Sequence, residues 1–180
     1  MNDPYDRISK REVYRNRWLT VEVHEIVHPT GAPGEHVLVV GGAPSGVLVV
    51  EGDAFVFARQ SRFGARARYI EIVKGGRDDG ETALDCAKRE LREEIGIEAD
   101  SWTPLGVAYE IPSIMDAPVE LFLATNVRIG ETDQEHVEDV EPVRMPIDEA
   151  FRAAADGRID DAVTLAAMLR YRLLTDGTGS

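Results

Sequence analysis

Residues 75–97 read GGRDDGETALDCAKRELREEIGI, a glycine-containing loop followed by a charged and periodic stretch. The periodic part predicts a helix that stops at Gly96, because glycine is favoured just after a helix C-terminus. At about 100° per residue, Glu90, Glu93 and Glu94 fall on one face of this helix. A short helix that gathers three carboxylates on one side predicts either a solvated acidic face or a cation site.

Like charges three and four residues apart destabilise a helix by a few tenths of a kcal/mol per pair, at roughly the scale measured in peptides. A hard divalent cation reverses that effect, because carboxylate oxygens are the ligands that Mg²⁺ and Mn²⁺ prefer. The small residues Ala83 and Cys86 share the acidic face and leave room for a close approach. The neighbouring face carries Leu84, Leu91 and Ile95, so we expect it to enter the core.

Composition limits the class of protein. The chain has 180 residues, of which 43% are hydrophobic and 29% charged, as in a soluble globular protein. No apolar run is long enough for a membrane helix and the first residues do not resemble a secretory signal, so the expected location is cytoplasmic, with no membrane partner. The single cysteine, Cys86, excludes an intramolecular disulfide. The net charge of −13 argues against a nucleic-acid partner, and a phosphate ligand would need cations as mediators.

The pattern along the chain predicts strands, one helix, more strands and then helices. This order is typical of an α+β fold, an α/β/α sandwich built on a mixed sheet. Residues 1–43 are expected to form an N-terminal strand segment, residues 44–176 the main domain and residues 177–180 a disordered tail. Apolar runs predict strands at 19–27, 36–40, 46–53, 54–59, 69–73, 102–110, 119–127 and 142–146, and periodic runs predict helices at 81–95, 147–157 and 160–174.

The stretch at 75–97 resembles the Nudix box of the Nudix hydrolases. The defining positions are all filled, by Gly75, Glu81, Arg89, Glu90, Leu91, Glu93, Glu94, Gly96 and Ile97. The resemblance implies a Nudix α/β/α sandwich and Mg²⁺ or Mn²⁺ held by Glu90, Glu93 and Glu94. It also implies that the backbone carbonyl of Lys74 or Gly75 adds a ligand, and that an ion pair between Arg89 and Glu81 orients the ligands.

The same resemblance implies hydrolysis of a nucleoside diphosphate linked to another moiety, with Glu90, Glu94 and Arg89 as parts of the catalytic machinery. In several relatives the general base is a glutamate in a loop well after the box. Glu135 occupies that place here, with Glu138 and Glu131 as neighbours, and a solvated acidic loop is the alternative.

Three features outside the box resemble the ADP-ribose diphosphatase branch. Pro112 stands 15 residues after Ile97, residues 57–76 resemble the lead-in to the box, and residues 157–174 resemble the terminal helix. They imply cleavage of ADP-ribose to AMP and ribose 5-phosphate, with Arg62 and Glu71 contacting the substrate or another subunit and Pro112 also at the substrate. The alternatives are that Pro112 is an ordinary loop proline, that Arg62 is a surface cation and that the terminal helix only packs in the core.

Two further features widen the possibilities. Lys74 stands where that branch has a small residue, and VKGG with PVRMP is similar to relatives that act on NADH or dinucleoside polyphosphates. The remaining alternatives are damaged nucleoside triphosphates, GDP-sugars and a non-catalytic nucleotide sensor. The N-terminal strands resemble a unit through which such proteins pair, so the resemblance implies a homodimer, with strands often exchanged between subunits.

Overall fold

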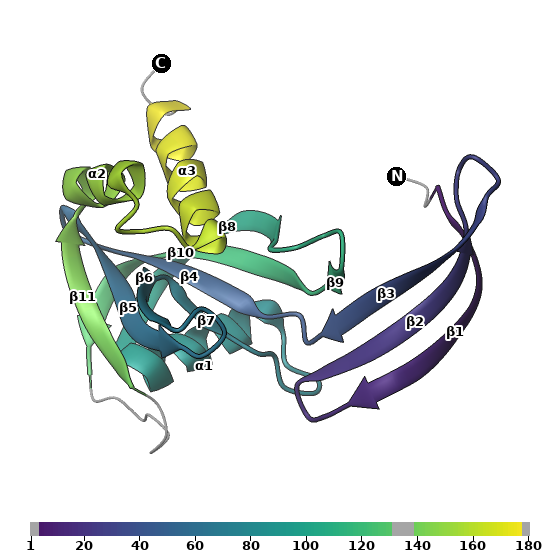
Figure 1. Cartoon of the computed structure of the whole chain (residues 1–180). Helices are drawn as coiled ribbons and strands as arrows, with labels where there is room; N and C mark the ends of the chain where they lie inside the picture. Colours follow the sequence, from purple (N-terminus) through teal and green to yellow (C-terminus); the bar gives the residue numbers. More distant parts are fainter. Residues whose placement is uncertain (1–3, 131–138, 178–180) are drawn as a thin grey trace. The chain divides into compact units, whose positions relative to one another are not determined.

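The structure is a computed structural model that describes residues 4–130 and 139–177. Its contacts divide the chain into two compact units (Figure 1). The first unit comprises Met1–Ala43 and Tyr109–Pro118, and the second comprises Pro44–Ala108 and Val119–Ser180. The segment 1–43 therefore lies in one unit with ten residues that come much later in the chain.

The first unit is built on a four-stranded sheet in the order β1-β2-β3-β9. These strands are Asp6–Arg15, Leu19–Val27, Pro33–Gly41 and Met115–Asp116, respectively. β2 pairs with β1 and β3 in antiparallel fashion, whereas β9 runs parallel to β3. The apolar alternation predicted β2 and β3. It did not predict β1, because the sequence DRISKREVYR is dominated by charged residues and every residue of this edge strand is exposed.

The second unit contains a seven-stranded mixed sheet in the order β11-β5-β4-β10-β8, with β6 beside β5 and β7 beside β4. β4 is parallel to β10 and antiparallel to β5, which is antiparallel to β11. The strand bounds are Ser45–Glu51 for β4, Ala54–Arg62 for β5, Ala67–Glu71 for β6, Val73–Gly75 for β7, Ile97–Tyr109 for β8, Pro118–Ile129 for β10 and Val140–Pro146 for β11.

In the part of the chain that the structure describes, three helices cover the two faces of this sheet: α1 (Ala83–Ile95), α2 (Ile147–Asp156) and α3 (Ala162–Gly177). Successive residues of a strand point to opposite faces. Accordingly, Val47 and Val49 of β4 pack in a cluster with α1, whereas Leu48 between them packs in a second cluster with α2 and α3. The predicted α+β class and α/β/α sandwich are confirmed. No helix in residues 4–130 and 139–177 is long and apolar enough to span a membrane.

The strand predicted at residues 69–73 is two strands that meet at Ile72. Before this residue β6 pairs with β5, with Glu71 opposite Ala58. After it β7 pairs with β4, with Val73 opposite Val47. The chain thus changes its partner strand at Ile72, just before it enters the glycine loop that leads to α1.

Candidate active site

Local signals in the sequence explain where α1 begins and ends. The Thr82 hydroxyl accepts a hydrogen bond from the Asp85 backbone N–H at 3.1 Å and so caps the N-terminus. At the other end Gly96 adopts a left-handed conformation with φ of 65°, and its N–H donates to the Arg92 carbonyl at 2.9 Å. The predicted helix at 81–95 is therefore present, with its first turn beginning at Ala83.

The face of α1 that carries the glutamates lies against the loop after β7. Glu94 is buried with 6% of its surface exposed, and the Glu90 and Glu93 side chains are 14% and 30% exposed. A Cβ atom built on Gly75 would lie 1.8 Å from the Glu90 carboxyl carbon. Only a residue without a side chain lets the Glu90 carboxylate lie this close to the backbone.

Arg89 connects three of the box carboxylates. Its guanidinium donates to Glu81 Oε1 at 3.0 Å and Glu81 Oε2 at 2.9 Å, to Glu90 Oε1 at 2.6 Å and to Glu93 Oε2 at 3.0 Å. These bonds, the one to Glu81 first, raise the pKa of Arg89, and the reciprocal bond lowers the pKa of Glu81. The predicted Arg89–Glu81 pair is present, and the same guanidinium also offsets the repulsion between Glu90 and Glu93.

The small residues on this face of α1 allow a close approach, and the loop after β7 makes it. Cys86 is fully buried, with its Sγ 3.5 Å from the Gly75 carbonyl oxygen and 3.4 Å from that of Gly76. Burial raises the pKa of the Cys86 thiol. The Ser45 hydroxyl donates to the Ala83 carbonyl at 2.8 Å and ties β4 to the start of the helix. The loop before α1 therefore occupies the space beside Cys86.

Arg62 and Glu71, expected near the substrate, form an ion pair in the second unit. Arg62 Nε donates to Glu71 Oε1 at 2.7 Å, and the Lys74 ammonium lies 3.0 Å from Glu71 Oε2. The whole of Glu71 is only 1% exposed. Its carboxylate thus faces two cations of its own chain, and the contacts observed for Glu71 are internal ones.

The sequence did not single out the side chains that continue this network. Lys74 Nζ donates to Asp161 Oδ1 at 2.8 Å, and Asp161 Oδ2 accepts from the Thr164 backbone N–H at 2.8 Å and from its hydroxyl at 2.6 Å. An aspartate followed three residues later by a threonine, at the start of a periodic run, is a helix-capping signal that marks Asp161. Nothing in the sequence pairs it with Lys74, 87 residues earlier.

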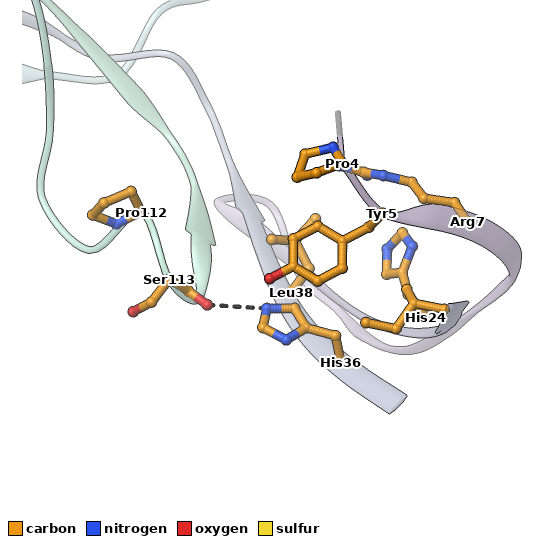
Figure 2. A pocket seen from close by; sticks show the side chains of 9 residues that line it. Pro4, Tyr5, Arg7, His24, His36, Leu38, Pro112 and Ser113 are labelled. Carbon is orange, nitrogen blue, oxygen red and sulfur yellow. Dashed lines mark hydrogen bonds between the residues drawn. The ribbon is translucent and has the colours of Figure 1, made fainter. Parts of the chain in front are cut away.

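Pro112 lies in the first unit, at the edge of a cavity of about 410 Å³ (Figure 2). Among the lining residues, the His36 ring nitrogen is hydrogen-bonded to the Ser113 carbonyl at 3.0 Å. The residues that line the cavity include Tyr5, Arg7, His24, His36, Leu38 and Pro112. The predicted base Glu135, with Glu131 and Glu138, lies outside the described residues.

Comparison with known proteins places this geometry in a class. Residues 42–168 match the model of the NUDIX domain, and residues 6–39 match that of the nucleoside diphosphate sugar hydrolase N-terminal domain. The first match covers well over half of the chain, so the protein belongs to the Nudix family and is a Nudix hydrolase.

Among its relatives, the chain is 26% identical over 169 residues to the ADP-ribose pyrophosphatase of Bacillus subtilis (strain 168), a match that covers 92% of this chain and 91% of that protein. It is 35% identical over 96 residues to the GDP-mannose pyrophosphatase of Yersinia enterocolitica, covering 52% of this chain and 50% of that protein. A crystal structure of an ADP compounds hydrolase has the same fold, with a TM-score of 0.85, 21% identity and coverage of 97% and 96% of the two chains.

Nudix hydrolases generally use divalent metal ions, and the box residues fit such an ion chemically. Glu90, Glu93 and Glu94 offer only hard oxygen donors, which suit Mg²⁺ and Mn²⁺. Within residues 4–130 and 139–177, no group of three His, Cys, Asp or Glu side chains has an arrangement that could hold a metal ion without side-chain movement. The Glu90 and Glu93 carboxylates each accept a hydrogen bond from Arg89.

Proposed function

We propose that the protein hydrolyses the diphosphate linkage of ADP-ribose to release AMP and ribose 5-phosphate, or that of a closely related ADP-linked nucleotide to release AMP and the phosphorylated remainder. The observation that carries the proposal is the acidic face of α1, where Glu90 lies directly against the Gly75 backbone with Glu93 and Glu94 beside it. Similarity over 92% of the chain to the ADP-ribose pyrophosphatase of Bacillus subtilis supports ADP-ribose as the substrate.

In this proposal Glu90, Glu93, Glu94 and the backbone carbonyl of Gly75 or Lys74 hold Mg²⁺ or Mn²⁺. The cation, when bound, supplies positive charge to the diphosphate oxygens and lowers the pKa of a water molecule. Gly75 lets the Glu90 carboxylate lie close to the loop, and Glu94 is buried on the same helix. Arg89 remains paired with Glu81, which fixes the guanidinium beside the ligand face.

The proposed reaction begins with attack of a water molecule on one phosphorus of the diphosphate. The bond from that phosphorus to the bridging oxygen breaks, and a general base accepts the proton of the water. Glu135 is our candidate for this base. Glu135→Gln is expected to lower kcat with little effect on metal affinity, and a silent variant would transfer the role to Glu138 or Glu131.

Substrate choice has a second candidate. The N-terminal match to a nucleoside diphosphate sugar hydrolase domain and the local 35% identity to a GDP-mannose pyrophosphatase favour a GDP-sugar as the alternative. NADH and dinucleoside polyphosphates are further alternatives within the same chemistry. A non-catalytic nucleotide sensor is disfavoured because Glu90, Glu93 and Glu94 are all retained.

The test is a Mg²⁺-dependent hydrolysis panel of ADP-ribose, NADH, diadenosine polyphosphates and GDP-mannose, with release of AMP or GMP as the readout. Glu94→Gln is expected to lower turnover of the preferred substrate by at least about 100-fold, because it removes a ligand charge. The matched control is Glu98→Gln, a carboxylate four residues later whose side chain is 61% exposed. No hydrolysis of any substrate by the wild type, or full activity of Glu94→Gln, would contradict the proposal.

Pro112, Arg62 and Glu71 are the residues predicted to contact the substrate. Pro112 remains our candidate because its cavity also carries the Tyr5 ring and the Arg7 cation, groups that suit a nucleoside base and a phosphate. Arg62 is 40% exposed and stays a candidate for contact with the substrate, whereas we assign buried Glu71 the role of holding Arg62 and Lys74. The cytoplasmic location stays a prediction.

We further propose that the first unit mediates a homodimer. β1 is the edge strand of its sheet, and it exposes 64% of Ile8 and 55% of Tyr14, while Trp18 just beyond it is 66% exposed. Edge strands with exposed apolar side chains are ready to pair with another chain. Sedimentation should show a dimer that Ile8→Asp converts to a monomer, whereas Leu173→Asp, at a site 63% exposed in the second unit, should remain dimeric. A monomeric wild type would refute the proposal.

A further inference from the structure

A polar clamp joins the start of α3 to the strand switch that precedes the glycine loop. At Ile72 the chain leaves β5 for β4, and this residue lies between two strands rather than in either. Its backbone N–H donates instead to the Thr164 hydroxyl of α3 at 2.9 Å. The same hydroxyl donates to Asp161 at 2.6 Å, so one side chain serves the strand switch and the helix start together.

A second contact holds the same segment two residues later. The Lys74 ammonium lies 2.8 Å from Asp161 Oδ1 and 3.0 Å from Glu71 Oε2, with side-chain exposures of 11%, 16% and 2% for Lys74, Asp161 and Glu71. The Lys74 ammonium is therefore held between two carboxylates, one before the strand switch and one at the start of α3.

The held segment is the one on which Glu90 depends. β7 is only three residues long, and it ends at Gly75, whose backbone lies against the Glu90 carboxylate. A shift of β7 would carry the Gly75 carbonyl and the support of Glu90 with it. The contacts through Thr164 and Lys74 fix β7 from the side of the sheet opposite α1, because Thr164 belongs to α3 and the two helices cover opposite faces.

We propose that Thr164, Asp161 and Lys74 are positioning residues that set the metal affinity of the box by fixing β7 at the strand switch. This inference rests on the proposed function, because it assumes that Glu90 is a metal ligand. In this proposal α3 does more than pack against the sheet, because it also helps to position the metal-binding residues. Groups that orient metal ligands change metal affinity by about 10- to 100-fold when they are removed.

The experiment measures Mn²⁺ binding directly, by electron paramagnetic resonance of the free ion, alongside urea unfolding. Thr164→Val removes the hydroxyl at nearly constant volume and should raise the Mn²⁺ dissociation constant by about tenfold. Thr164→Ser keeps the hydroxyl and should retain the wild-type constant. Lys74→Met removes the second contact independently and should also raise the Mn²⁺ dissociation constant.

A destabilised control separates positioning from stability. Met145→Ala truncates a buried side chain of β11 that belongs to the same core cluster, so it should lower the urea midpoint and leave the Mn²⁺ constant unchanged. The proposed clamp is overturned if Thr164→Val, like Met145→Ala, lowers the urea midpoint but leaves the Mn²⁺ dissociation constant unchanged. A wild type that binds Mn²⁺ but hydrolyses no nucleotide would sink the proposed function and leave the clamp standing, whereas a wild type that binds no Mn²⁺ would overturn both.

Discussion

Gly75→Ala is the sharpest test of the site, because one methyl group is aimed at one carboxylate. The added Cβ would lie 1.8 Å from the Glu90 carboxyl carbon and 2.1 Å from each of its oxygens. Non-bonded carbons sit about 3.5 to 4.0 Å apart, so the carboxylate must retreat by roughly 1.7 Å. A misplacement of about 1 Å at a catalytic centre can cost about 100-fold in rate, which corresponds to about 2.7 kcal/mol.

The fold should tolerate this change. Gly75 is not among the glycines of positive φ, so alanine can adopt its backbone conformation. We expect the free energy of unfolding in urea to stay within about 1 kcal/mol of wild type. We also expect kcat/KM for ADP-ribose to fall by about 100-fold, with the Mg²⁺ dependence moved to higher concentration.

Gly76→Ala is the matched control, since a Cβ on Gly76 would meet no atom within 4 Å and this residue also lacks a positive φ. It should keep wild-type activity and Mg²⁺ dependence. If Gly75→Ala kept the wild-type Mg²⁺ dependence, Glu90 would not need its place against Gly75, and the assignment of Glu90 as a ligand would fail.

Two further predictions concern ionisable groups buried near the box. The Cys86 thiol is fully buried and its pKa is raised by burial, so a disulfide reagent should label the native protein far more slowly than the protein in urea. Rapid labelling of the native state would contradict the burial of this thiol. Burial would raise the pKa of the Asp161 carboxyl, but Lys74 and Thr164 lower this pKa overall. The ionised carboxylate therefore stabilises the fold fully above the unfolded pKa of 3.8, and this stabilisation is lost as the pH falls through the lower pKa of the folded state. The stability difference between wild type and Asp161→Asn should therefore shrink in acid urea titrations, and a difference independent of pH would argue against this ion pair.

Local patterns predicted most of the second unit and much less of its polar network. Alternating or continuous apolar runs predicted β4, β5 and β10, because burial on sheet faces imposes that pattern along the chain itself. The break at Ile72 left no such signal, because it depends on which strands lie alongside. The contact between Lys74 and Asp161 joins residues far apart in sequence, so it required the fold before it could be seen.

The candidate site follows the same division. The spacing of Glu90, Glu93 and Glu94 placed them on one face of a helix, as observed, because helical geometry is local. The reach of Arg89 to several carboxylates at once depends on the position of Glu81 before the helix, which only the folded loop defines. Glu71 carried a charge typical of a surface residue, and its burial depends on cations contributed by two different strands.

The bonds of Arg89 also bear on how this protein responds to ion supply. Small zinc domains remain unfolded until their metal arrives, because their ligands have no other source of stability. Here the Arg89 guanidinium already offsets part of the repulsion on the acidic face of α1 by bonding to Glu90 and Glu93. We therefore expect the chain to accumulate as folded protein in a metal-starved cell and to gain activity without refolding once the ion returns. The supply of the ion would then control the catalytic rate of the protein rather than the amount of folded protein.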